Sequence, residues 1–520
     1  MTRAANPDLN DPMADSFADL ITDPITDSIT DLDAHALSEA IHARELSCRE
    51  VMQAYLARID KLNPAANAVV NLAPPEGLLQ QAEEHDALLA RGQSKGWMHG
   101  LPQAIKDLSA TAGFATTQGS RLLKDAVVSS DGLMAARMKG AGAIVIGKTN
   151  TPEFGLGSHT FNELFGVTPN AWDNTRTAGG SSGGAAVALA LRLLPVADGS
   201  DFMGSLRNPA GWNHVFGMRP SAGRVPRMPA PEWSVSQLAT EGPMGRTVLD
   251  LAQLLSVQAG YDAHSPLSVA QAAQSFVPPQ HAQARGLRVG WLANLNGYLA
   301  MDGGVLSVCE QALARLVSAG AVVEPVNLGF DAAAVWQAWL VWRKALTVGN
   351  VAAVMHLPQA RDFIKPEALW EHDTAQGLSF ADFMQASRVR SQFHAHMLLL
   401  FERFDVLALP SAQVWPFPHV ERWPKKIGNR AMDTYHRWME VTIYATFAGL
   451  PAISVPAGFG GSLASSGPWP MGLQLIGPPL ADAQVLHVAQ AYANVSSDLL
   501  LRRPPQPRMG QVLQTGRVEG

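Results

Sequence analysis

The sequence predicts an α/β fold, in which helices and strands alternate around a sheet with parallel character. A helix-like segment at 131–142 leads directly into 143–147, whose unbroken apolar run is typical of a buried strand. A similar alternation of strand, helix and strand returns at 287–328. Elements that alternate in this way usually pack as one layered body.

The composition supports a large core and argues against several classes of partner. Of the 520 residues, 47% are hydrophobic and only 16% are charged. The formal net charge of −6 disfavours nucleic acid and anionic membrane, because both require clustered Lys and Arg. We therefore expect a small-molecule ligand, with no nucleic acid and no membrane as partner.

The start of the chain and the cysteine content indicate a cytoplasmic protein. The N-terminus lacks the apolar core of a signal peptide, and no apolar run approaches the ~18 residues of a membrane span. Residues 1–32 are acidic and turn-prone, so we expect a flexible arm, with order beginning near Asp33. Cys48 and Cys309 are far apart in sequence, which disfavours a disulfide framework or a thiolate zinc site and predicts two buried thiols.

Two helices are predicted in the first hundred residues. Ser47 and Glu50 form a capping box ahead of an amphipathic pattern, and the helix that they begin is expected to end before Pro64. A second helix is expected at 77–91. Farther along, two buried strands are predicted in the apolar stretches at 447–459 and 471–479, and a closing helix at 485–492.

Two glycine-rich turns, each carrying serine, bracket a buried helix. The first, Gly179–Gly184, precedes the apolar segment AAVALALRLL, which is rich in good helix formers. The second, Gly199–Ser205, places Ser205 after several backbone N–H groups that can converge on one oxygen, as in an oxyanion hole. Glycine lets the backbone approach a ligand closely. The serines in these turns are therefore candidate nucleophiles.

Two familiar motifs match these segments in pattern but not in context. Residues 142–149, GAIVIGKT, fit the pattern of a phosphate-binding loop, yet the four variable residues are β-forming and follow a helix. Gly179–Gly183 fits the nucleophile elbow of α/β-hydrolases, but the preceding segment is polar and turn-like rather than a buried strand. A nucleotide-dependent enzyme is therefore disfavoured.

Lysine is a better candidate than histidine for the base that would activate a serine. His159 and His214 are the histidines nearest to the serine turns in sequence, and we interpret both as packing or hydrogen-bonding residues. Lys106 ends a short predicted strand, and burial can lower the pKa of a lysine amine toward neutrality. With such a base, one serine would be the nucleophile and the other would relay its proton.

Aromatic residues are concentrated between residues 331 and 440. Trp336, Trp339 and Trp342 lie on or near one predicted helix face. A loop-like stretch adds Trp415, Phe417, Trp423, Tyr435 and Trp438. Core packing or a homodimer contact accounts for these residues, and a substrate-pocket wall is the alternative.

Six segments, in this order, resemble the amidase signature family. They are Pro102–Asp107, GKTNTPEF from Gly147, GGSSGG from Gly179, GSDFMGSLRNPA from Gly199, GPMGRTVLDLA from Gly242 and GLPAISVPAGF from Gly449. The resemblance implies a single large domain at 33–520, with a mixed β-sheet core covered by helices on both faces. Its common core would cover about 70–260 and 440–495, and its variable helical and aromatic region about 331–440.

The resemblance also implies roles for individual residues. Ser205 would be the acyl-forming nucleophile, Ser181 the bridging serine after a cis bond from Gly180, and Lys106 the base. The implied oxyanion and substrate-binding residues are Phe202, Met203, Gly204 and Ser182, with the Ser205 amide as a further donor. No metal or organic cofactor is required by this mechanism.

Some positions depart from the family pattern or invite a second interpretation. Phe202 and Met203 stand where the family commonly has a smaller residue and a glycine, so they are expected to narrow or reshape the pocket. Arg207 is interpreted as a loop-fixing residue, with carboxylate binding as the alternative. Asp107 is expected to orient the lysine loop. Asn213-His214 and Arg219 also differ from the usual residues.

The leading functional hypothesis is an amidase that hydrolyses a small acyl amide, with an aryl or apolar acyl group suggested by the aromatic-rich second half. The reaction would pass through a seryl acyl-enzyme and release acid plus ammonia or amine, with esterase as a side activity. The alternatives are a glutamine-dependent amidotransferase A-type subunit, which needs a partner subunit, and a non-catalytic binding protein that retains the fold.

Overall fold

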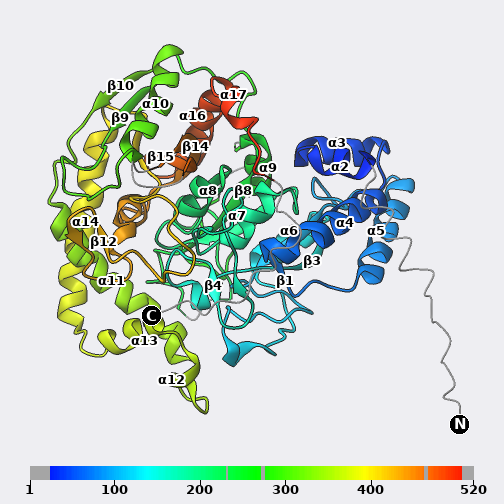
Figure 1. Ribbon diagram of the computed structural model, residues 1–520, viewed down its shortest axis with the longest axis horizontal. Coiled ribbons are helices and arrows are strands. Elements are labelled where there is room, and N and C mark those ends of the chain that lie inside the picture. The colour runs from blue at the N-terminus through cyan, green and yellow to red at the C-terminus, as the bar shows by residue number, and fades with distance from the viewer. Residues whose placement is uncertain (1–23, 230–231, 271–275, 462–466, 506–520) are drawn as a thin grey trace, which may run out of the picture.

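The computed structural model describes residues 24–229, 232–270, 276–461 and 467–505, and its centre is an eight-stranded mixed β-sheet (Figure 1). In spatial order the strands are β10 (Val322–Pro325), β9 (Arg288–Trp291), β11 (Val406–Pro410), β15 (Trp469–Ile476), β14 (Ala452–Gly460), β7 (Phe216–Arg219), β8 (Thr240–Gly245) and β6 (Ala197–Asp201). This confirms the predicted α/β fold with a mixed sheet.

Parallel pairing occurs where the sequence alternates strand, helix and strand. Strands β9 and β10 are parallel and are joined by helix α10 (Val305–Ser318), as the alternation at 287–328 predicts. Strand β11 extends this parallel edge, and the other pairs of the large sheet are antiparallel. A smaller sheet contains β1 (Val69–Val70), β3 (Ile144–Thr149) and β2 (Pro102–Lys106), with β2 and β3 parallel.

Helices cover both faces of the large sheet. The register puts Gly217, Ser454 and Gln474 on one face, because residues opposite each other in an antiparallel ladder project to the same side. Helix α8 (Arg207–Asn213) packs on this face and reaches Gln474 by hydrogen bond. The other face is covered by α9 (Val248–Gln258), α10 and α16 (Asp482–Asn494).

The N-terminal helices differ from the predictions at two points. Helix α2 (Pro24–Asp31) packs against α4 (Cys48–Ala66), so the part of the predicted flexible arm at 24–31 is helical; residues 1–23 lie outside the described residues. Helix α4 begins at the predicted capping box but continues through Pro64. Pro64 lies in the last turn, where few backbone hydrogen bonds remain to be lost, and beyond the helix end the Asn63 side chain accepts the N–H groups of Ala68 and Val69.

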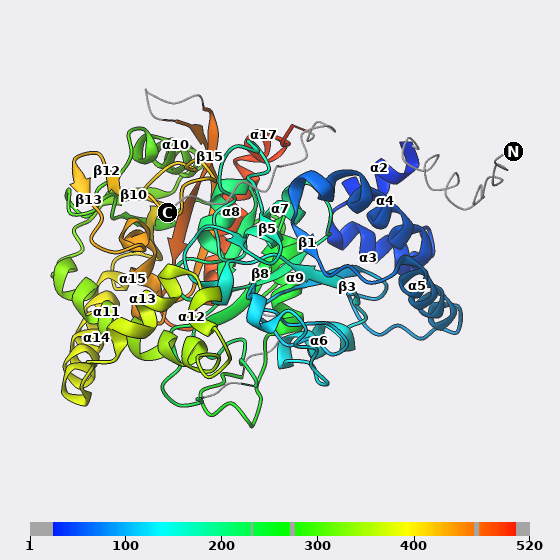
Figure 2. The ribbon, with the colours of Figure 1, turned by 60° about the horizontal axis from the view of Figure 1, so that its bottom comes forward.

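Most of the other long helices form two groups at opposite ends of the molecule. Figure 2 shows α2–α5 at one end and α11–α14 at the other, with the strands between them. These helices include α3 (Ala34–Ala43), α5 (Pro75–Ala90), α11 (Ala332–Ala352), α12 (Ala360–Phe363), α13 (Pro366–Ala375) and α14 (Phe380–Phe401). Among the described residues, no helix is both long and apolar enough to cross a lipid bilayer.

Short elements complete the chain and contribute the loops around the site. They are η2 (Arg121–Leu123), α6 (Leu133–Gly140), η3 (Glu153–Gly155), β4 (Phe161–Asn162), β5 (Gly166–Val167), α7 (Gly183–Ala190), β12 (Lys426–Ile427), β13 (Arg430–Ala431), η5 (Arg437–Thr442), α15 (Ile443–Phe447) and α17 (Ser497–Leu500). Helix α7 is the buried helix predicted between the two serine turns, and every one of its residues is buried.

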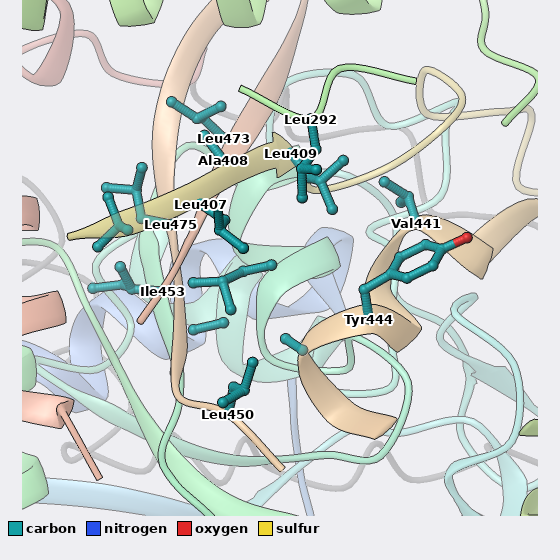
Figure 3. Packing of buried hydrophobic residues seen from close by; sticks show 14 of the residues in the cluster. Leu292, Leu407, Ala408, Leu409, Val441, Tyr444, Leu450, Ile453, Leu473 and Leu475 are labelled. Atoms are coloured by element: carbon teal, nitrogen blue, oxygen red, sulfur yellow. The ribbon is translucent and has the colours of Figure 1, made fainter. Parts of the chain in front are cut away.

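The main hydrophobic core lies on the large sheet. Figure 3 shows Leu407 and Leu409 of β11 together with Leu473 and Leu475 of β15, while Tyr444 approaches from α15. Cys48 and Cys309 are both free and buried, as predicted. Burial of this apolar surface holds the sheet and its covering helices together and fixes the strand ends from which the site is built.

Candidate active site

Lys106 is the last residue of β2, and its side chain is 1% exposed. Its Nζ lies 2.8 Å from Ser181 Oγ, 2.7 Å from Ser182 Oγ and 3.0 Å from Ser200 Oγ. Three hydroxyl groups thus surround the amine, which is the number of hydrogen bonds that a lysine ammonium can donate. The structure therefore brings the predicted base to the first serine turn.

Burial lowers the pKa of Lys106 to about 7. Asp198 lies nearby and opposes this shift, but its Oδ2 accepts the backbone N–H of Lys106 at 3.1 Å rather than pairing with the amine. Burial also raises the pKa of Asp198 to about 6. Near neutral pH a substantial fraction of Lys106 is an uncharged amine, which can accept a proton.

The first serine turn lies between an irregular segment and α7. The Gly180–Ser181 peptide bond is cis, as the resemblance implies. Gly183 is required by packing, because a Cβ there would lie 2.3 Å from Thr160 Oγ1. Ser181 is 3% exposed and faces a cavity, whereas Ser182 is fully buried beside Lys106 and does not line it. The Ser182 hydroxyl therefore lies against Lys106 rather than in the cavity wall, and substrate binding by this residue stays a prediction.

The second serine turn connects β6 to α8 and is organised by the carboxylate of Asp201. Its oxygens accept the N–H groups of Gly204 at 2.9 Å and Leu206 at 3.3 Å, and both receive hydrogen bonds from Arg207 at 3.0 Å. Burial alone would raise the pKa of Asp201, but the Arg207 guanidinium holds it well below its usual range. Asp201 is therefore a structural carboxylate that remains ionised.

Arg207 is fully buried and ties the second turn to distant parts of the chain. Besides Asp201, it donates to the Thr442 carbonyl at 3.0 Å, Gln474 Oε1 at 2.6 Å and Thr446 Oγ1 at 3.0 Å. These contacts satisfy the guanidinium within the protein, which agrees with the loop-fixing interpretation and not with carboxylate binding. Arg219 supports the same turn by donating to the Asp201 carbonyl at 2.6 Å.

One of the predicted oxyanion donors is directed elsewhere. The Gly204 N–H donates to Asp201, so the structure contradicts its assignment as an oxyanion donor. Gly204 instead shapes the turn, because it has a φ of 82° and a Cβ there would lie 2.5 Å from Thr442 Cγ2. The amides of Phe202, Met203 and Ser205 remain the predicted donors.

A cavity of about 120 Å³ joins the two serine turns. Ser181, Ser200 and Ser205 all line it, so the relay serine and the nucleophile predicted from the sequence face the same space. The remaining wall is mixed: Leu108, Phe154, Leu156, Phe202, Met203 and Met439 are among its apolar side chains, and Ser158, Ser236, Thr240, Thr347 and Asn350 are among its polar ones. In the described part of the chain, no Asp or Glu lines this cavity; the charged lining residues are Arg227 and Arg343.

Arg343 of α11 forms a buried ion pair at the cavity wall. Its Nε donates to Glu371 at 2.6 Å, and its Nη2 donates to the Tyr435 hydroxyl at 2.6 Å. Its Nη1 faces Met203 Sδ at 3.7 Å, and its guanidinium lies 5.6 Å from the Phe202 ring centroid. Arg343 thus supports the two bulky residues that depart from the family pattern.

The tryptophans of α11 belong to the core rather than to the cavity wall. Trp336, Trp339 and Trp342 are buried within the main hydrophobic cluster, and Trp339 packs against Phe202 at a centroid distance of 5.5 Å. Of the loop aromatics, Trp415, Phe417, Tyr435 and Trp438 are also buried. The core-packing interpretation is therefore confirmed for these residues, and α11 supplies Arg343, Leu346 and Thr347 to the cavity instead.

The histidines near the serine turns have structural roles. His159 Nε2 bonds with the His419 carbonyl and its Nδ1 with Thr177 Oγ1, while His214 Nε2 bonds with the Leu499 carbonyl. Burial lowers the pKa of His159 to about 3 and of His214 to about 4, so both are uncharged.

The lysine loop and the rejected phosphate-loop motif are likewise structural. Asp107 accepts the Thr117 N–H at 3.0 Å and so orients the segment after Lys106, as expected. Residues 144–149 of the motif form strand β3. The side chain of Lys148 is buried there and donates to the Ser109 carbonyl at 2.6 Å.

Asp198 is not a candidate in the sequence analysis, and Ser200 is included there only as one of the serines of the second turn. Both lie in β6, within or next to the second serine turn, and their contacts with Lys106 arise because β6 packs beside β2. Period-two alternation along β6 was the available signal, since Asp198 and Ser200 project to the same side of the strand.

Comparisons with known proteins identify the family of the chain. Residues 50–486 match the family model described as Amidase. The A-type subunit of the glutamyl-tRNA(Gln) amidotransferase from Moorella thermoacetica is 33% identical over 497 residues, covering 91% of this chain and 98% of that protein.

Two solved structures extend the comparison. A bacterial aryl acylamidase of the amidase signature family superposes with a TM-score of 0.83 at 28% identity, covering 91% of this chain and 99% of that chain. The A-type subunit of the glutamyl-tRNA(Gln) amidotransferase from Thermotoga maritima gives a TM-score of 0.70 at 28% identity, covering 89% and 94%.

Proposed function

Because the chain belongs to the amidase signature family, we propose that it is an amidase that hydrolyses a carboxylic amide to an acid plus ammonia or an amine. The observation that carries this proposal is the buried Lys106 amine, which lies 2.8 Å from Ser181 Oγ at the edge of a cavity that Ser205 also lines. A hydrolase that acts through a serine needs such a base, since the hydroxyl is a weak nucleophile until its proton is removed.

The proposed reaction has two acyl-transfer steps. Neutral Lys106 accepts the Ser181 proton while Ser181 accepts the Ser205 proton, and Ser205 Oγ forms a bond with the amide carbon. The relay returns the proton to the nitrogen as the C–N bond breaks, which leaves an ester between the acyl group and Ser205. Water then attacks this ester by the same proton route and regenerates the serine.

The oxyanion formed during each step needs hydrogen-bond donors that are already in place. The amides of Phe202, Met203 and Ser205 are the proposed donors, because they lie in the turn that Asp201 and Arg207 hold in shape. Losing one such donor typically slows turnover about a hundredfold or more. A side-chain change at position 202 or 203 leaves the backbone donor present.

The cavity lining favours an aryl or apolar amide over an amide that carries a free ammonium group. Its wall carries apolar side chains from Leu108, Phe154, Leu156 and Met439, and no Asp or Glu among the described residues lines it. A free glutamine carries an α-ammonium group, and binding it away from water without a carboxylate partner is unfavourable. The likeness to an aryl acylamidase structure supports the same substrate class.

A glutamine-dependent amidotransferase A-type subunit is the second candidate, and the curated relatives favour it. The Moorella thermoacetica protein, 33% identical over almost its whole length, is of that kind. In this alternative the chain would release ammonia from glutamine and pass it to an acceptor on a partner protein. A binding protein that retains the fold is the third candidate.

The purified protein alone distinguishes these functions. It should release aniline from anilides of small acids, and intact-mass spectrometry should find the matching acyl adduct on Ser205 when the reaction is quenched early. Release of ammonia from glutamine, with no cleavage of anilides, would favour the amidotransferase. If a fluorophosphonate probe fails to label the folded protein, a binding role is favoured. Cleavage of the corresponding esters measures the proposed esterase side activity.

A further inference from the structure

Arg227 is a charged residue at the proposed site that the reaction described above does not use. It lines the cavity together with Ser181 and Ser205, and it is exposed. In the described part of the chain Arg227 forms no ion pair, whereas the other arginine in this wall, Arg343, is buried and paired with Glu371 at 2.6 Å. The two arginines are therefore not equivalent.

The charge balance of the cavity favours a negatively charged ligand. Glu371 neutralises Arg343, and the described lining contains no Asp or Glu, so the positive charge of Arg227 has no counterpart in the wall. The nearby acid Glu241 is 6% exposed and its Oε1 accepts the Ser109 hydroxyl at 2.6 Å. Burial raises the pKa of Glu241, and the charge of Arg227 opposes this rise, but no ion pair joins the two side chains in the described part of the chain.

We propose that Arg227 binds a carboxylate of the substrate, so that this amidase acts on amides that carry a carboxylate group. The proposal rests on the proposed amidase function and names its substrate class. A guanidinium presents paired N–H donors that match the two oxygens of a carboxylate. The exposed position of Arg227 puts this contact on the solvent side of the cavity, while the apolar wall holds the rest of the substrate.

Two pairs of anilides of matched shape test whether Arg227 binds a substrate carboxylate. They also show whether the acyl half or the amine half of the substrate carries the charge. On the amine side, 4-acetamidobenzoate is compared with 4-acetamidoacetophenone. On the acyl side, 4-anilino-4-oxobutanoate is compared with the anilide of 4-oxopentanoic acid. Within each pair a carboxylate is replaced by an acetyl group of similar size, so the pair differs mainly in charge.

In the wild-type protein, kcat/KM should be about 10- to 100-fold higher for the carboxylate in one of the two pairs. Arg227→Gln should bring that ratio close to one, mainly by raising KM for the carboxylate, and Arg227→Lys should restore part of it. Arg285→Gln, which changes an exposed arginine outside the cavity lining, should leave the ratio as in the wild type.

The assay is run above pH 8, because Arg227 also lowers the pKa of Lys106 and its loss would slow both members of a pair at lower pH. Carboxylate binding by Arg227 is contradicted if kcat/KM of the wild-type protein is the same for both members of each pair. It is also contradicted if Arg227→Gln lowers kcat/KM equally for both members. A failure to cleave any anilide would contradict the proposed function instead.

A second measurement tests carboxylate binding by Arg227 without requiring turnover. Each compound is tested as a competitor of fluorophosphonate labelling. One of the carboxylates should protect the wild-type protein more strongly than its neutral partner and lose that advantage in Arg227→Gln. Equal protection by charged and neutral compounds in the wild type would overturn the proposal.

Discussion

Lys106 Nζ and Ser181 Oγ are 2.8 Å apart, although 75 positions separate the two residues in the chain. The contact forms because β2 ends beside the turn that precedes α7, inside a part of the protein where neither side chain is more than 3% exposed. Because burial depresses the pKa of the lysine to about 7, the amine at this contact is partly uncharged near neutral pH and is able to accept a proton.

Replacing the proposed nucleophile should stop the reaction without unfolding the protein. Ser205→Ala should lower kcat by at least about a thousandfold and abolish fluorophosphonate labelling. The melting temperature should change little, since a single hydroxyl at the cavity is removed. Ser318→Ala, which removes a hydroxyl from the exposed side of α10, is the matched control and should keep full activity. Turnover by Ser205→Ala near the wild-type rate would exclude this serine as the nucleophile.

The activity should rise with pH around neutrality. Only the uncharged amine of Lys106 accepts a proton, and its pKa is lowered to about 7. The rate constant kcat/KM should therefore fall roughly tenfold per pH unit below about 6 and level off above about 8. A pH profile with a neutral substrate measures this, and Lys106→Met should remove the activity at every pH. A flat profile between pH 5 and 8 would contradict the assigned base.

The same lysine should affect stability in a pH-dependent direction. Its pKa is about 7 in the folded protein and 10.5 for a lysine exposed to water, so between these values the folded state binds fewer protons than the unfolded state. This group's contribution to the free energy of unfolding therefore increases as pH rises through that window. The melting temperature of Lys106→Met minus that of the wild-type protein should therefore be higher at pH 6 than at pH 10. An equal difference at both pH values would contradict the shifted pKa.

Shortening Met203 should alter substrate preference but spare the backbone donor. Met203→Ala enlarges the cavity beside Arg343, so bulkier acyl groups should gain in kcat/KM relative to acetyl, while labelling by a small fluorophosphonate persists. Loss of the buried side chain should lower the free energy of unfolding by about 2–5 kcal/mol. Met397→Ala, in the core of α14, should lose similar stability with no change in preference. Parallel changes in both variants would refute this role of Met203.

The Arg343–Glu371 pair should matter far more than a neighbouring surface pair. Glu371→Gln leaves a buried arginine without its charge partner, so the free energy of unfolding should fall by about 3–5 kcal/mol. Asp373→Asn, on the same helix α13, breaks the exposed ion pair with Arg361. This substitution should change the free energy of unfolding by less than about 1 kcal/mol. Urea denaturation measures both. Similar effects of the two substitutions would show that the buried pair is not essential to the fold.

The sequence predicted most of what is encoded locally. The capping box of Ser47 and Glu50, the buried helix α7 and the strand–helix–strand unit at 287–328 each follow from residues close together in the chain. The predicted end of α4 before Pro64 is wrong, because a proline in the last turn of a helix removes few hydrogen bonds and so does not end it.

The environment of the site could not be predicted in the same way. Lys106, Ser181 and Ser205 were identified through ordered motifs, but the ion pair of Arg343 joins residues on two helices of the variable region, where no motif or periodicity specifies the partner. The direction of the Gly204 N–H likewise depends on how the turn folds around Asp201, which the sequence of the turn alone does not specify. Both features arise from packing between distant segments.

The hydrogen bonds of Arg207 to the Thr442 carbonyl and Gln474 Oε1 also determine when the second serine turn can reach its final form during synthesis. On the ribosome, the segment around Ser205 emerges long before the strand that carries Gln474. Until that strand has emerged and joined the sheet, the turn has its local contacts with Asp201 but lacks the contact with Gln474. A nascent or prematurely terminated chain would therefore carry the proposed nucleophile in an incompletely supported turn.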